Sequence, residues 1–172
     1  KVSEIAKKIK LLIVDVDGVL TDGGIYFDDN GVEQKKFDSQ DGLGIKLLQL
    51  SGIEVAVITA RSTKSVAHRL KGLGVEHYYH GILDKSIALE KLIKKLSIDP
   101  SESAYVGDDV IDLPVMTRVA LPIAVANAQE SVKDHALMVT EKSGGNGAVR
   151  EVCNFLLKSQ DKYAALVKSF LK

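Results

Sequence analysis

Two aspartates, Asp15 and Asp17, follow directly after a run of branched apolar residues at 11–14. Such a run is typical of a strand buried on both faces inside a parallel sheet. Because side chains alternate along an extended chain, residues two apart project to the same side. The two carboxylates should therefore leave the strand together and repel each other, by about 1 kcal/mol in water and roughly 4 kcal/mol at an intermediate dielectric. A bound metal ion, a shared proton or both would offset this repulsion.

Two simpler explanations of these aspartates are less favourable. In the first, Asp15 caps a neighbouring segment and Asp17 belongs to a turn, but a turn does not need a carboxylate at the last buried position of a strand. In the second, the segment is a calcium-binding EF-hand loop. Val19 and Leu20 then occupy the positions of a ligand and of the invariant glycine, which excludes that loop.

Further polar side chains follow later apolar segments in the same way. Thr59 stands near the end of the segment 53–60, Asp108 follows the segment 104–106 and its glycine, and Lys85 opens an expected helix. In a parallel sheet the carboxyl ends of the strands lie at one edge, and ligands bind beyond that edge. The side chains expected to meet there are Asp15, Asp17, Thr59, Lys85, Asp108, Asp109 and Asp112.

Carboxylates, a hydroxyl and an ammonium around one crevice suit a divalent cation and an anionic substrate. Mg²⁺ fits best, because it binds through a few carboxylates, keeps waters and pairs with phosphate. Lys85 and Thr59 would hold phosphate oxygens by charge and hydrogen bonding. Asp15 would attack phosphorus to form an aspartyl-phosphate, and Asp17 would protonate the leaving oxygen and later activate water. We therefore predict a magnesium-dependent phosphatase.

The elements that must position these groups alternate between strands and helices. Short apolar segments predict strands at 11–14, 53–60, 77–79, 104–106, 123–126 and 137–140. Helices are expected from the 38–42 loop to about residue 50, from 62 or 63 to 72–74, at 84–96, after 109, between the last two strands, and at about 148–158. This alternation predicts an α/β fold, a three-layer α/β/α parallel sheet, in a single domain over residues 1–172.

Residues 24–37 predict a protruding β-hairpin. Its two alternating segments flank Asn30-Gly31, the strongest short-range signal for a two-residue turn. Pairing through that turn would place Ile25 and Phe27 on one face together with Val32. Because an isolated two-stranded hairpin is marginal in water, this one should lean on the domain or, as we favour, on another subunit.

The glycines at 144–147 lack the Lys-Ser/Thr of a P-loop, so they do not predict nucleotide binding. We expect a flexible turn there that aims Arg150 and the C-terminal tail. The tail, at about 160–172, is amphipathic but weakly anchored.

Composition limits the remaining function classes. The formal net charge is zero, which argues against nucleic acid as a partner. The single cysteine, Cys153, suits packing in a reducing compartment. No run of about 18 apolar residues and no secretory signal is present, so we expect a cytoplasmic protein without membrane contact.

Four motifs, in this order, resemble those of the haloacid dehalogenase superfamily. They are Asp-Val-Asp-Gly-Val-Leu-Thr-Asp at 15–22, Thr59, Lys85 and Gly-Asp-Asp-x-x-Asp at 107–112. A receiver domain also uses Asp, Thr and Lys, but its acceptor Asp lies on a middle strand, so the order here differs.

Within that superfamily the chain is similar to the family of 3-deoxy-D-manno-octulosonate 8-phosphate (KDO 8-phosphate) phosphatases. The similarity covers the hairpin directly after Thr-Asp-Gly at 21–23, the absence of an inserted cap domain, and the segments 105–116 and 144–153. It implies a capless fold and a homotetramer in which the hairpins pack together. It also implies C-terminal tails that close over neighbouring active sites, and Mg²⁺-dependent hydrolysis of a sugar-acid phosphate on the route to the lipopolysaccharide inner core.

The resemblance also assigns roles to residues. Asp15 is the nucleophile and Asp17 the acid/base; Asp15, the backbone carbonyl of Asp17, and Asp108 bind the metal. Asp109 and Asp112 support these ligands from behind. The substrate contacts that it implies, some of them across a subunit boundary, are Asp17, Asp38, Ser39, Gln40, Asp41, Gly42, Lys46, Arg61, Arg69 and Lys85.

Two positions bear on which substrate is used. Gln40 stands where that family often has a basic residue, which weakens one expected contact, whereas Arg61, directly beyond the phosphate threonine region, suits a substrate that carries a carboxylate. The alternatives are a phosphatase of a nine-carbon sugar acid, such as KDN or sialate 9-phosphate, and a non-catalytic assembly module. The module is disfavoured because the motif residues are all retained: Asp15, Asp17, Lys85 and Asp108.

Overall fold

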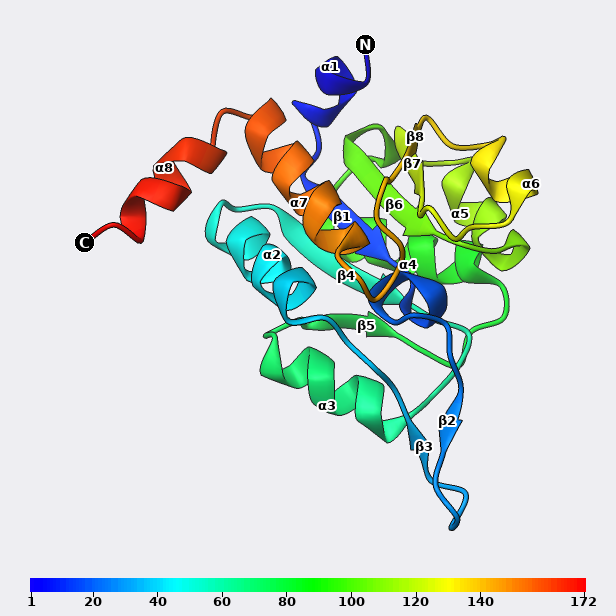
Figure 1. Ribbon diagram of the computed structural model, residues 1–172. Coiled ribbons are helices and arrows are strands. Elements are labelled where there is room, and N and C mark those ends of the chain that lie inside the picture. Colours follow the sequence, from blue (N-terminus) through cyan, green and yellow to red (C-terminus); the bar gives the residue numbers. More distant parts are fainter.

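A six-stranded sheet forms the centre of the computed structural model, which describes all 172 residues, Lys1–Lys172. Its strand order is β5-β4-β1-β6-β7-β8, and every neighbouring pair is parallel (Figure 1). The strands are β1 Leu11–Val14, β4 Glu54–Ile58, β5 His77–Tyr79, β6 Ser103–Gly107, β7 Leu121–Ala124 and β8 Met138–Val139. Val14, at the carboxyl end of β1, lies level with Val57 and Val106. The predicted parallel sheet is confirmed, with strand limits that differ by a few residues.

Helices cover both faces of the sheet. They are α1 Val2–Ala6, α2 Ser39–Leu50, α3 Lys64–Gly72, α4 Lys85–Leu96, α5 Leu113–Met116, α6 Glu130–Lys133, α7 Ala148–Ser159 and α8 Tyr163–Ser169. Figure 1 shows α2 and α7 side by side over one face, with α4 and α5 behind the sheet. The predicted three-layer α/β/α arrangement is therefore confirmed. None of the helices is long and apolar enough to span a membrane.

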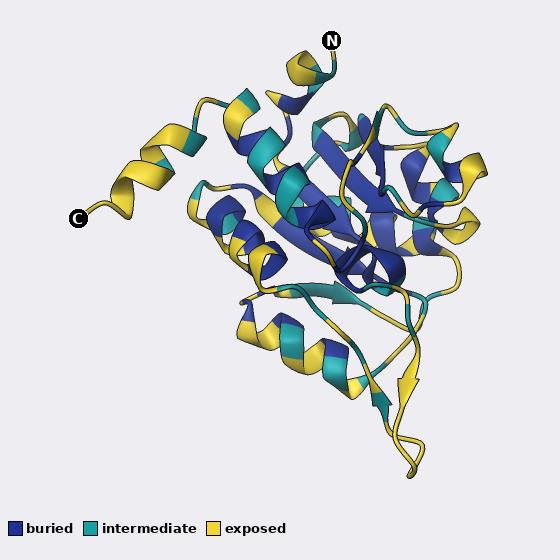
Figure 2. Cartoon of the chain, in the orientation of Figure 1, coloured by how far each residue is buried: buried dark blue, intermediate teal, exposed yellow.

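Apolar side chains of the sheet and of the inner helix faces form one core. Its cluster holds 42 buried residues, and all four residues of β1 belong to it. Figure 2 shows this core as a dark blue centre, with exposed surface on the hairpin and on α8. Burial on both faces explains why β1 is a continuous apolar run. Its first polar residue is consequently the one that emerges at the sheet edge.

The hairpin projects from the body of the molecule (Figure 1). It consists of β2 Tyr26–Phe27 and β3 Glu33–Gln34. The predicted two-residue turn is wrong. Asp28 N donates to Val32 O at 3.1 Å and Gly31 N donates to Asp28 O at 3.0 Å, so three residues form the turn. Gly31 alone among them has a positive φ, 75°, which is the pattern of a type I turn followed by a glycine bulge.

Side-chain capping explains this turn. The Asp28 carboxylate accepts hydrogen bonds from Asn30 N and Val32 N, both at 2.9 Å, and so stabilises the longer loop. The register changes with the turn, because Phe27 now pairs with Glu33. Val32 therefore lies on the face opposite Phe27, and the prediction that they share a face is also wrong.

The glycine segment at 144–147 is closely packed, which corrects the expectation of a flexible turn. Gly144 N donates to Asn127 Oδ1 at 2.8 Å, and Gly145 N donates to Val19 O at 3.1 Å. A Cβ on Gly144 would overlap the carbonyl oxygen of Gly18. Glycine is needed here because two backbone segments touch and leave no room for a side chain.

Candidate active site

The site begins where β1 ends. Asp15 is 4% exposed, and its Oδ1 accepts from Val16 N at 2.7 Å and pairs with Lys85 Nζ at 2.9 Å. Asp108 follows β6, the strand beside β1, and is brought next to it by the parallel register. Asp15, Asp108 and Asp112 each offer a carboxylate oxygen, and these oxygens lie within 4.8 Å of one another. The predicted meeting of acidic groups from two strands is therefore present.

Gly18 allows the turn Val16–Leu20 to pass directly beside Asp108. Its φ is 83°, and a Cβ at this position would overlap Asp108 Oδ2. Its carbonyl oxygen accepts a hydrogen bond from Asn127 Nδ2 at 3.0 Å. The turn is thus held from the side of β7, and glycine is required by both its backbone angle and its contact.

Lys85 is fully buried at the start of α4. Its Nζ lies 2.7 Å from Asp112 Oδ1 and 3.2 Å from the Tyr105 hydroxyl, in addition to its pair with Asp15. Burial disfavours the charged ammonium, but the charges of Asp15 and Asp112 outweigh it and raise the pKa of Lys85. A cation at a helix start is unfavourable alone, so these two carboxylates stabilise it there.

Asp112 has no free oxygen. Its Oδ1 accepts from Lys85 and from the Tyr105 hydroxyl, and its Oδ2 accepts from Asp108 N at 2.9 Å and Asp109 N at 3.2 Å. Asp112 belongs to the acidic cluster, but its oxygens are already occupied by the hydrogen bonds that order the loop after β6. Asp15 and Asp108 remain as the carboxylates that can bind a cation.

The acidic cluster carries excess negative charge. Burial, followed by the neighbouring carboxylates, raises the pKa of both Asp15 and Asp108, while Lys85 opposes the rise at Asp15. A single ammonium does not neutralise the three carboxylates. A divalent cation between Asp15 and Asp108 would relieve that repulsion, and carboxylate oxygens are the ligands that Mg²⁺ prefers.

A hollow of about 270 Å³ opens above these carboxylates. Thr59, which is buried, lies on its wall and its Oγ1 accepts from Arg61 N at 3.3 Å. The hollow is lined by Asp15, Asp17, Gly23, Thr59, Ala60, Arg61, Asp108, Asp109 and Ile111. Lys85 and Asp112 lie beneath Asp15. The structure thus gathers all seven side chains of the predicted constellation, and it adds Arg61.

Other predicted substrate contacts lie outside this hollow, on α2 or beside it. Asp38 caps that helix, Arg69 lies over the Phe37 ring at 5.9 Å, and Asp41 is only 1% exposed. Asp41 Oδ1 accepts from Arg150 N at 2.9 Å, so it serves the packing of α7 on α2. The others predicted here are Gly42, which is buried, and Ser39, Gln40 and Lys46, which are exposed.

The sequence analysis missed three residues that complete the site. Lys35, beyond β3, pairs with Asp17 Oδ1, and Glu33 pairs with both Lys35 and Arg61. Their spacing places Glu33 and Lys35 on one face of the hairpin, but no pattern shows that this face meets the hollow. Tyr105 had a signal, because a tyrosine in a fully buried strand needs a partner for its hydroxyl.

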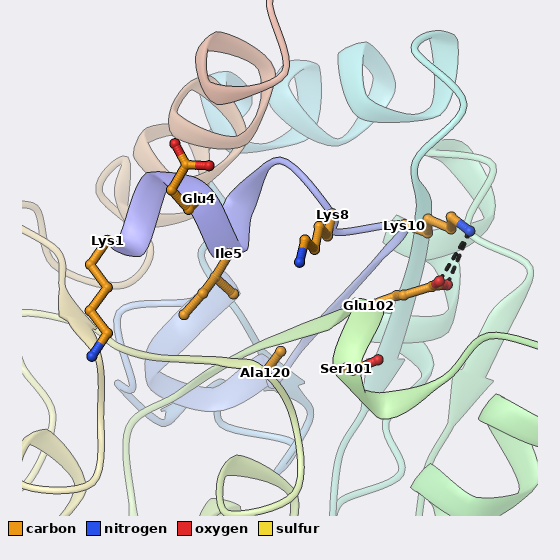
Figure 3. Close-up of a pocket in the computed structure, with 8 residues that line it drawn as sticks. All are labelled: Lys1, Glu4, Ile5, Lys8, Lys10, Ser101, Glu102 and Ala120. Atoms are coloured by element: carbon orange, nitrogen blue, oxygen red, sulfur yellow. Dashed lines mark hydrogen bonds and ion pairs between the residues drawn. The ribbon is translucent and has the colours of Figure 1, made fainter.

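A larger hollow, of about 520 Å³, lies at the opposite edge of the sheet, near the amino ends of β1, β6 and β7 (Figure 3). Its lining is Lys1, Glu4, Ile5, Lys8, Lys10, Ser101, Glu102 and Ala120. Lys10 pairs with Glu102 at 3.2 Å, and Figure 3 shows Glu4 directed away from Lys1. These mixed, solvated charges do not converge on one point. The larger of the two hollows is therefore not the candidate active site.

The chain is similar in sequence and structure to known proteins. The model of the haloacid dehalogenase-like hydrolase family matches residues 79–152. A 3-deoxy-D-manno-octulosonate 8-phosphate phosphatase of Escherichia coli K12 is 52% identical over 157 residues, 91% of this chain and 84% of that protein. The structure of the same phosphatase from Yersinia pestis matches with a TM-score of 0.93 and 47% identity, over 95% of this chain and 88% of that one.

The Moraxella catarrhalis phosphatase of the same name was solved with a magnesium ion, a phosphate ion and KDO. It matches with a TM-score of 0.96 and 45% identity, over 98% of this chain and 97% of that one.

Proposed function

This chain belongs to the 3-deoxy-D-manno-octulosonate 8-phosphate phosphatase family of the haloacid dehalogenase-like hydrolases, and on that premise we propose how its residues act. The protein is a phosphatase that uses Mg²⁺ and hydrolyses that sugar-acid phosphate. The observation that carries the mechanism is the convergence of Asp15 and Asp108 on one point, with Lys85 beneath them.

The residues present fit Mg²⁺. Asp15 and Asp108 would hold the ion with the backbone carbonyl of Asp17, because the oxygens of Asp112 are already taken. When bound, the ion neutralises charge on Asp15 and on the phosphate oxygens, and so permits an anion to approach.

The reaction proceeds in two steps through Asp15. A carboxylate oxygen of Asp15 attacks phosphorus, the ester P–O bond breaks, and Asp17 gives its proton to the leaving sugar oxygen. In the second step Asp17 takes a proton from water, the water oxygen bonds to phosphorus, and the bond between Asp15 and phosphorus breaks. Thr59 holds phosphate oxygens in both steps, and Lys85, buried beneath Asp15, supplies the positive charge that favours the phosphate there.

Arg61 would bind the carboxylate of the sugar acid, since it lines the same hollow. The predicted contacts on α2, from Asp38 to Gly42 and at Lys46, and Arg69 on α3, lie outside the hollow of this chain. We propose that those with accessible side chains reach substrate held by a neighbouring subunit. Asp41 is buried, and we assign it to the packing of α7.

The hairpin supports a homotetramer. Ile25 and Phe27 are 61% and 63% exposed, and exposed apolar side chains on a projecting arm suit burial against other copies. Sedimentation of the intact protein measures this assembly directly. We also propose that residues 1–172 form one domain, supported by their common core, and that the protein is cytoplasmic, in keeping with its single free thiol at Cys153.

Substitution of the nucleophile tests the function. Phosphate release is measured with Mg²⁺ from eight-carbon and nine-carbon sugar-acid phosphates, for the wild type and for Asp15→Asn. We expect higher catalytic efficiency on the eight-carbon compound, and no turnover by the variant, which lacks the attacking oxyanion. Turnover by folded Asp15→Asn would contradict the mechanism. A clear preference for the nine-carbon compound would contradict the substrate and leave the chemistry intact.

A further inference from the structure

The hairpin reaches back from its exposed tip into the active site. Lys35 directly follows β3, and its Nζ lies 2.5 Å from Asp17 Oδ1. The Lys35 side chain is only 1% exposed, although its neighbours along the hairpin are largely exposed (Figure 2). Glu33, on the same face, lies 3.3 Å from Lys35 and 2.8 Å from Arg61. One short segment, 33–35, therefore contacts two residues that line the hollow, Asp17 and Arg61.

The ion pair with Lys35 distinguishes the two oxygens of Asp17. Oδ1 accepts from Lys35, and no other group hydrogen-bonds to this side chain, so Oδ2 is the oxygen left for the hollow that Asp17 lines. A carboxyl group whose one oxygen is fixed by a buried cation has little freedom to rotate. The same oxygen is then available both to donate a proton and to accept one.

We propose that Lys35 is a positioning residue that holds Asp17 with Oδ2 toward the leaving oxygen of the substrate. The proposal rests on the function assigned above, in which Asp17 passes a proton to the sugar oxygen as the ester bond breaks. Glu33 stabilises Lys35 in this place and links it to Arg61. The hairpin thereby contributes to proton transfer in addition to any role between subunits.

The adjacent lysine provides a matched control. Lys36 points to the other side of the strand, where its Nζ donates to Gly145 O at 2.8 Å and Asn146 Oδ1 at 3.1 Å. It anchors the hairpin to the body of the protein without touching Asp17. Loss of Lys36 therefore measures what anchoring alone contributes.

Two substrates separate proton transfer from other effects. A sugar phosphate releases an alkoxide, which needs a proton, whereas 4-nitrophenyl phosphate releases a stable phenolate that leaves without one. The parameter kcat/KM covers the steps up to breakage of the ester bond. A defect in the orientation of Asp17 should therefore lower kcat/KM for the sugar phosphate and leave the aryl phosphate almost unchanged.

The experiment compares Lys35→Met, Lys35→Arg and Lys36→Met with the wild type, as intact assemblies with Mg²⁺. For Lys35→Met we expect kcat/KM to fall about 10- to 100-fold on the sugar phosphate, part of the roughly 100- to 10,000-fold that a general acid supplies. The fall on the aryl phosphate should stay below about threefold. Lys35→Arg should recover most of the loss, and Lys36→Met should keep the wild-type ratio between substrates.

Equal losses on both substrates in Lys35→Met, including losses caused by changed assembly, would overturn the proposal. So would the same selective loss in Lys36→Met. If Lys35→Met does not fold, Lys35→Gln is tested instead, because its polar amide is better tolerated beside Asp17 and Glu33. The same selective loss on the sugar phosphate is then expected. A wild type inactive on both substrates would instead refute the proposed function, so the two failures are distinguishable.

Discussion

Asp41 joins two helices by a buried carboxylate, and its replacement by Asn tests the electrostatics of that joint. It lies in the first turn of α2, and its Oδ1 accepts from Arg150 N, in the first turn of α7. The N-cap residue of α7 is Gly147, which has no side chain to cap the helix. Asp41 Oδ2 is buried without a hydrogen-bond partner. Burial, opposed by the Arg150 amide, raises the pKa of Asp41 to about 6.

The raised pKa of Asp41 determines whether the protein gains or loses stability as pH rises. Because the folded protein holds the Asp41 proton more tightly than the unfolded chain, the free energy of unfolding falls as pH rises between about 4 and 6. The rise in the pKa from 3.8 to about 6 corresponds to a loss of about 3 kcal/mol in the free energy of unfolding over the whole titration of Asp41. Between pH 5 and pH 8 the part that is lost is about 1.4 kcal/mol. Asp41→Asn keeps an acceptor for Arg150 and removes the charge.

Urea unfolding from pH 5 to pH 8, at one protein concentration, measures the difference. We expect the stability of Asp41→Asn relative to the wild type to improve by about 1.4 kcal/mol over this range. Titration of Asp15 and Asp108 is common to both proteins and cancels. The control is Asp99→Asn, because hydrogen bonds to Ser101 lower the pKa of Asp99 and it stays ionised throughout. A pH-independent difference for Asp41→Asn, parallel to that control, would refute the reasoning.

Four further predictions concern the cation site and its support. Gly18→Ala should weaken Mg²⁺ binding about 10- to 100-fold, measured by calorimetry, because its Cβ would displace Asp108; unchanged affinity would contradict this. Removal of Mg²⁺ by a chelator should abolish turnover and lower the Tm. Since protons compete for Asp15 and Asp108, whose pKa values burial raises, Mg²⁺ affinity should also weaken as pH falls, and pH-independent affinity would argue against these ligands. Tyr105→Phe should reduce the free energy of unfolding by about 1–3 kcal/mol in urea, because it removes a hydroxyl that contacts Lys85; an equally stable variant would show that the hydroxyl contributes little.

The centre of the site could be predicted because few geometric rules determine it. A buried parallel strand sends its first polar residue to the carboxyl edge, and the neighbouring strand does the same, so Asp15 and Asp108 had to meet. Lys85 was predictable for a related reason, since a cation is poorly placed at a helix start without carboxylates nearby. Local sequence and topology agree at these positions.

Contacts that depend on packing at a distance could not be predicted. The burial of Asp41 results from the position of α7, more than a hundred residues later in the chain. The pairing of Lys35 with Asp17 depends on the hairpin register, which the Asp28 side chain shifts away from the two-residue turn. In both cases the sequence pattern predicted the element, helix α2 or the hairpin, but did not show which distant residues it would contact.

The contact between Gly144 and the carbonyl of Gly18 has a consequence for the order of assembly. The turn that carries Asp17 precedes Asn127 and Gly144 by more than a hundred residues, yet its backbone is covered by Gly144 and hydrogen-bonded by Asn127. A nascent chain that ends before these residues has the nucleophile but lacks the surface that fixes the turn around it. Catalytic competence on the ribosome should therefore appear late and abruptly, once the segment beyond β8 has emerged from the exit tunnel.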